Sequence, residues 1–72
     1  MSKLKVCSGE EAVRKFKKAG WTVARIKGSH VIMIKTGHIA NLSIPQHKEL
    51  DRGLLRSLIR VAGLTVEEFN QL

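Results

Sequence analysis

Hydrophobic residues follow a helical spacing near the start of the chain. Apolar residues at i, i+1, i+4 and i+7 form one stripe between Ser8 and Gly20. Ser8 and Glu11 have the spacing of a capping box, and glycine is a common stop at a helix end. We therefore expect a helix between Ser8 and Gly20, after a short leader over residues 1–7. Four residues form its core-facing stripe: Ala12, Val13, Phe16 and Ala19.

The middle of the chain is rich in β-branched residues and contains three runs typical of strands. The first run covers residues 21–27, the second covers residues 31–35 and the third covers residues 39–44. Gly28-Ser29 separates the first two runs, and Thr36-Gly37 separates the second from the third. Short turns of this kind predict consecutive antiparallel strands.

The third run alternates most clearly between apolar and polar residues. Because successive side chains of a strand point to opposite faces, we expect Ala40, Leu42 and Ile44 to face the core. Pro45 ends this run, since proline has no backbone N–H for a central ladder.

The last third of the chain predicts two helices. Asp51 is an N-cap candidate for the first, and Gly63 is its stop. Thr65 and Glu68 repeat the capping-box spacing before a short terminal helix. The apolar residues of these helices are Leu54, Leu55, Leu58, Ile59, Ala62, Phe69 and Leu72.

The element order α-β-β-β-α predicts an α+β fold, a two-layer sandwich of a three-stranded antiparallel sheet with helices on one face. The same order is found in the double-stranded-RNA-binding-domain architecture, an analogy of fold that does not define function. Seventy-two residues suit one domain over residues 1–72. Trp21 follows the first helix directly, so we expect a core anchor rather than a base-stacking residue.

Thirteen Lys and Arg against six Asp and Glu give a formal net charge of +7. Such a charge favours a polyanion: nucleic acid, an anionic membrane surface or an acidic protein. The membrane is the weakest of these, because the cations share their helices with core leucines rather than with an exposed apolar face. Seven cations are candidates for contacts with an RNA backbone: Arg25, Lys27, Lys35, Arg52, Arg56, Lys17 and Lys18.

Two further features bear on the compartment. The longest unbroken apolar run, residues 31–34, is far shorter than a membrane span, and a single cysteine, Cys7, has no intramolecular partner for a disulfide. We therefore expect a cytoplasmic protein that does not bind membranes.

Three histidines, His30, His38 and His47, carry the candidate chemistry. Their spacing matches no metal motif, and we expect neither a metal nor another cofactor. Histidine exchanges protons near neutral pH, and the 2′-hydroxyl of RNA can itself attack the adjacent phosphate. His30 follows a glycine-bearing turn with cations nearby, so it is the main candidate for proton transfer to or from RNA. From residue types alone, an ordinary surface histidine is the alternative.

Several segments resemble, in their order and spacing, the HicA toxin family. They are Gly20-Trp21, residues 25–30 (Arg-Ile-Lys-Gly-Ser-His), residues 44–47 (Ile-Pro-Gln-His), residues 53–59 and residues 62–64. The resemblance runs from about Ser8 to Leu72. It implies an mRNA interferase with a fold like the double-stranded-RNA-binding domain. Such a protein is a cytoplasmic type II toxin that cleaves mRNA and blocks translation.

The resemblance also implies partners and residue roles. A HicB-type antitoxin would neutralise the toxin, and any oligomer would form mainly through that antitoxin. His30 matches the catalytic histidine of the family. His47 and Ser29 are candidates for a second catalytic or phosphate-binding group, whereas His38 has no counterpart and is expected at a surface turn. Two alternatives stay open: a non-catalytic RNA-binding module, and a domain that binds an acidic protein.

Overall fold

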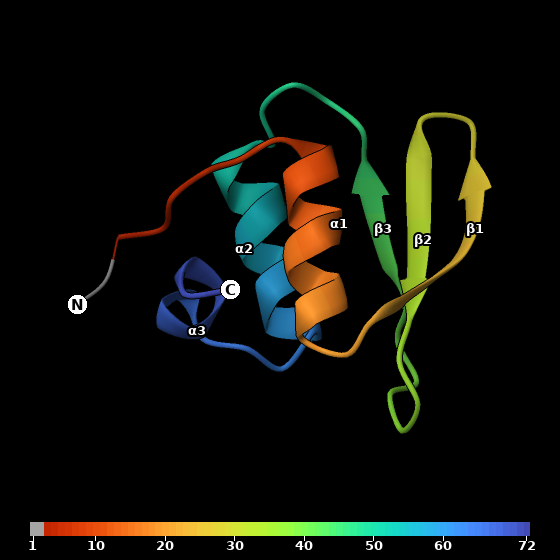
Figure 1. Cartoon of the computed structure of the whole chain (residues 1–72). Coiled ribbons are helices and arrows are strands. Elements are labelled where there is room, and N and C mark those ends of the chain that lie inside the picture. Colours follow the sequence, from red (N-terminus) through yellow and green to blue (C-terminus); the bar gives the residue numbers. More distant parts are fainter. Residues whose placement is uncertain (1–2) are drawn as a thin grey trace.

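The computed structural model describes residues 3–72 and arranges them in two layers, with helices on one side of a sheet (Figure 1). The strands are antiparallel, in the order β1-β2-β3. This is the expected α+β architecture, so the predicted fold class is confirmed. The elements are α1 (Gly9–Lys18), β1 (Thr22–Lys27), β2 (His30–Ile34), β3 (Leu42–Pro45), α2 (Arg52–Val61) and α3 (Val66–Asn70).

Polar side chains begin all three helices at the predicted residues. The Ser8 hydroxyl accepts a hydrogen bond from the Glu11 N–H at 3.0 Å, and the Asp51 carboxylate accepts from the start of α2. Thr65 and Glu68 form a complete capping box at α3. These caps satisfy N–H groups that have no partner within the helix.

The core lies between the helices and the strands β2 and β3. Phe16, Trp21, Met33 and Phe69 are almost fully buried, and Trp21 is 1% exposed. Trp21 is therefore the core anchor that the sequence predicted. The His38 ring lies against it at the surface, with 5.2 Å between ring centroids.

The segment before α1 is part of the core rather than a leader. Leu4 and Cys7 are buried, and the Leu50 N–H donates to the Cys7 carbonyl at 2.8 Å. The side-chain amide of Asn70 donates to the Lys3 carbonyl at 2.7 Å. The predicted leader is thus wrong for residues 3–7, because these residues contact positions far along the chain. Residues 1–2 of the prediction lie outside the described residues.

The third strand begins at Leu42, three residues later than predicted. The cross-strand pair of Met33 and Leu42 is the last one of that hairpin, so residues 35–41 form a loop beyond the sheet. Ile39 and Ala40 are exposed there, and the expected place of Ala40 on the core face is wrong.

β1 lies at the outer edge of the sheet, and all six of its residues are exposed (Figure 1). α1 and α2 cover the central and far strands, where Val31, Met33, Leu42 and Ile44 are buried. The helical layer therefore stops short of β1. Within residues 3–72, no helix is both long enough and apolar enough to cross a membrane.

Candidate active site at one end of the sheet

A two-residue turn, Gly28-Ser29, places His30 at the first position of β2. Lys27 and His30 are direct cross-strand partners on either side of this turn. Gly28 has φ +60°, whereas Ser29 has a negative φ, as in a type II′ turn with glycine at its first central position. A Cβ atom at Gly28 would meet no atom within 4 Å, so the turn is open to a ligand.

The end of β3 holds this turn in place. Pro45 is the cross-strand partner of His30 on the other side, and the Gln46 N–H donates to the Ser29 carbonyl at 2.7 Å. His47 follows two residues after Pro45, so the strand pairing brings His30 and His47 to the same end of the sheet. Both histidines are exposed.

The first residue of α1 completes this end of the sheet. The Gly9 N–H donates to the His47 carbonyl at 2.9 Å. A Cβ atom at Gly9 would lie 2.1 Å from the Pro45 carbonyl oxygen and 2.8 Å from the Gln46 Cα. The helix therefore approaches the loop after β3 so closely that only glycine fits at this position.

The positioning roles of Gly9 and Gln46 are not evident from the sequence. There, Gln46 is only the residue between Pro45 and His47, and Gly9 is only part of a capping segment. Their partners lie about 15 to 40 positions away along the chain, and no local pattern reports such contacts. A shallow cavity of about 300 Å³ opens beside them and is lined by Ser8, Glu10, Gln46, His47 and Lys48.

Two of the predicted basic residues share a sheet face with His30. Val31 is buried beneath the helices, so the neighbouring His30 points to the opposite face. Lys27 lies on that face as the cross-strand partner of His30, and so does Arg25, two residues earlier on β1. All three side chains are exposed, and together with the turn they form an open basic surface.

The other predicted basic residues lie apart from this surface. The Lys35 ammonium donates to the Ala19 carbonyl at 2.9 Å, at the end of α1, which lies at the opposite end of β2 from His30. The Arg52 guanidinium donates to the Leu4 carbonyl at 3.2 Å. Lys17 and Lys18 are exposed on the last turn of α1.

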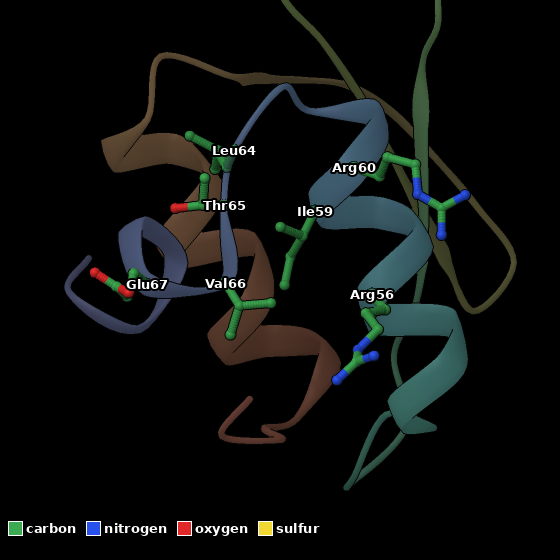
Figure 2. A pocket seen from close by; sticks show the side chains of 7 residues that line it. All are labelled: Arg56, Ile59, Arg60, Leu64, Thr65, Val66 and Glu67. Carbon is green, nitrogen blue, oxygen red and sulfur yellow. The ribbon is translucent and has the colours of Figure 1, made fainter. Parts of the chain in front are cut away.

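Arg56 belongs to a pocket of about 440 Å³ on the helical layer. Figure 2 shows Arg56 and Arg60 on α2 at one side of this pocket, with Glu67 at the other. The predicted basic residues are therefore spread over both layers. Only Lys27 and Arg25 share a face with His30.

Two observations bear on metal and thiol chemistry. Among residues 3–72, no three His, Cys, Asp or Glu side chains come together in a group suited to a metal ion. Burial raises the pKa of the Cys7 thiol, and Glu11 adds to this effect, while Lys15 opposes it. A raised pKa leaves less thiolate, which is the reactive form of cysteine.

Known proteins share the sequence pattern and the fold of this chain. Residues 9–64 match the sequence model of a family described as HicA toxin of bacterial toxin-antitoxin. A chain of a solved toxin-antitoxin complex from Streptococcus pneumoniae is similar in structure, with a TM-score of 0.69 and 34% sequence identity. The similarity covers 79% of this chain and 97% of that one. No curated protein matches the sequence.

Proposed function

The chain belongs to the HicA family of toxins of bacterial toxin-antitoxin systems, and we propose that it is an endoribonuclease that cleaves mRNA. The observation that carries this proposal is the placement of His30. It stands next to an exposed turn, on the open face of the sheet, as the cross-strand partner of Lys27 and at the same end of the sheet as His47.

The proposed reaction uses the nucleophile that RNA already contains. The 2′-oxygen attacks the adjacent phosphorus, the bond from phosphorus to the 5′-oxygen breaks, and a 2′,3′-cyclic phosphate and a 5′-hydroxyl result. His30 either takes the proton from the 2′-hydroxyl or gives one to the leaving 5′-oxygen. Because no water has to be activated, this transesterification at the phosphodiester needs no metal ion.

Lys27 and Arg25 supply positive charge on the same face as His30. Their proposed role is to bind phosphate and to stabilise the negative charge that develops during the attack. The backbone of the Gly28-Ser29 turn is open to the same phosphate, and the Ser29 hydroxyl is a candidate donor to it. His47 is the proposed second proton-transfer group, because it lies at the same end of the sheet.

The proposed biological role is that of a cytoplasmic toxin that blocks translation, as part of a stress response. Its proposed partners are mRNA and a HicB-type antitoxin, through which any oligomer mainly forms. The similarity to a chain of a toxin-antitoxin complex supports an antitoxin partner.

The test compares wild type with His30→Ala, using His38→Ala as the matched control. His38 is also an exposed histidine, but it lies on the loop at the far end of the sheet from the Gly28-Ser29 turn. We expect His30→Ala to abolish growth arrest and to slow RNA cleavage by about 100-fold or more, with His38→Ala close to wild type.

Product analysis separates the alternatives. Fragments that end in a 2′,3′-cyclic phosphate support the reaction above, whereas 5′-phosphate ends contradict it. Full cleavage by His30→Ala refutes the assignment of His30, and loss of wild-type cleavage in EDTA refutes the metal-free route. Wild type that binds RNA without cleaving it would make the chain a binding module.

A further inference from the structure

A groove of about 380 Å³ runs between α1 and the outer strand β1. Val23 and Ile26 of β1 form one wall, although they are 38% and 69% exposed. They lie on the helix-facing side of the sheet, because their cross-strand partners are the buried residues Met33 and Val31. Apolar burial thus stops between β2 and β1, and the side chains of β1 are left uncovered.

The opposite wall of the groove comes from α1. Val13 adds to the apolar lining, and Arg14 and Lys17 stand on the rim one and two turns after Glu10. Glu10 and Gln46 mark the end nearest the histidines, whereas the cations mark the other end. Among residues 3–72, the ion partner of Arg14 is Glu11 at 3.2 Å, and this pair is exposed, so the charge of Arg14 is available to a partner.

The lining of the groove indicates the chemistry of what it binds. Neighbouring β-branched side chains that stay exposed on one wall form the kind of apolar patch that marks a protein contact. RNA fits this lining poorly, since the groove has no aromatic side chain for stacking and its apolar side chains are all aliphatic. The basic rim instead suits a protein segment that carries apolar side chains next to carboxylates.

The edge of β1 favours docking of side chains over addition of a strand. The register of β1 on β2 shifts between Val23 and Arg25, which marks a bulge, and Arg25 and Lys27 add charge to the strand. Bulges and charged residues are the features that protect an edge strand from pairing with another chain. The surface of β1 that is available to a partner is therefore the side-chain wall of the groove rather than the backbone edge of the strand.

We propose that this groove is the docking site of the antitoxin, and the inference rests on the proposed toxin function. An apolar side chain of the antitoxin inserts between Val23 and Ile26, and a neighbouring carboxylate meets Lys17. Ile26 lies two residues before Gly28, so a protein seated in the groove stands beside the His30 turn.

The test uses Ile26→Asp, with Ile39→Asp as its matched control. Both isoleucines are exposed on the sheet layer, but Ile39 is 103% exposed on the far loop and lines no part of the groove. Each variant is titrated with a purified HicB-type antitoxin that binds wild type, and its melting temperature is compared with that of wild type. We expect Ile26→Asp to weaken binding by at least ~30-fold and Ile39→Asp to stay within about 3-fold.

Several outcomes would overturn the proposal. One is unchanged antitoxin affinity of Ile26→Asp; another is equal weakening by both variants. A wild-type toxin that self-associates in the absence of antitoxin, and becomes monomeric with Ile26→Asp, would assign the groove to a second copy of the chain. Loss of RNA binding with intact antitoxin binding would assign it to the substrate. Antitoxin binding does not depend on RNA cleavage, so the titration tests the groove even if the chain proves not to be a nuclease. Failure of the groove proposal and failure of the proposed nuclease function can therefore be told apart.

Discussion

Replacing Gly9 by alanine tests how the candidate site is held together. Alanine normally favours a helix over glycine by about 1 kcal/mol, so helix propensity alone predicts a more stable protein. Here the new Cβ would lie 2.1 Å from the Pro45 carbonyl oxygen, and real Cβ atoms essentially never come within 3.0 Å. The backbone after β3 must therefore move by about 0.9 Å or more.

This overpacking costs about 1–3 kcal/mol in well-packed proteins. The Gly9 variant should also lose or lengthen the 2.9 Å hydrogen bond from its N–H to the His47 carbonyl. We expect a net loss of about 2 kcal/mol in the free energy of unfolding. For a domain of this size that lowers the melting temperature by about 8–16 °C. Because the moving segment carries Gln46 and His47, RNA cleavage should also fall at temperatures where the variant is folded.

Gly53→Ala is the matched control, measured by thermal melting under the same conditions. Gly53 also lies in the first turn of a helix, but its Cβ would meet only the flexible carboxylate of Asp51, at 3.2 Å. We expect Gly53→Ala to be as stable as wild type or slightly more stable. A Gly9→Ala protein that melts at or above the wild-type temperature would refute the reasoning.

Three further predictions concern the core and its supports. Trp21→Ala should cost roughly 3–5 kcal/mol in thermal melting, where a small change would contradict the place of Trp21 in the core. Cys7 should react slowly with iodoacetamide at pH 8, because burial raises the pKa of its thiol, and fast only in denaturant; rapid labelling of folded protein would contradict its burial. Lys35→Met should lower the melting temperature by roughly 4–8 °C, because the Ala19 carbonyl loses its donor; an unchanged melt would show that this hydrogen bond adds nothing.

The local parts of this fold are predictable because they follow from short-range chemistry. Ser8, Asp51 and Thr65 begin helices by bonding to N–H groups two or three residues away, and the sequence shows that spacing directly. The Gly28-Ser29 turn is equally local, since it needs only a glycine that adopts a positive φ. The position of His30 directly after this turn, where a strand begins, can therefore be predicted from the sequence alone.

The parts that the sequence does not predict depend on distant contacts. Leu4 looks like part of a leader until α2 and α3 provide the surface that buries it. Ala40 fits an alternating strand, but the residue opposite it in the register is Lys35, which lies beyond the end of β2 at Ile34. Lys35 is a predicted phosphate contact, and the sequence does not show that its ammonium also bonds to a carbonyl at the end of α1. In each case the pattern is correct locally, and tertiary structure decides the outcome.

The two segments that flank the family match, residues 3–8 and 65–72, lie against each other. The side chain of Asn70 bonds to the backbone of both Lys3 and Lys5, and Leu4 and Phe69 enter the same core cluster. We therefore expect the described ends of the chain to open together and to gain or lose their hydrogen-exchange protection together. A fusion partner attached at either terminus would therefore act on the same contacts between Asn70, Lys3 and Lys5. These contacts lie on the helical layer, away from the His30 turn.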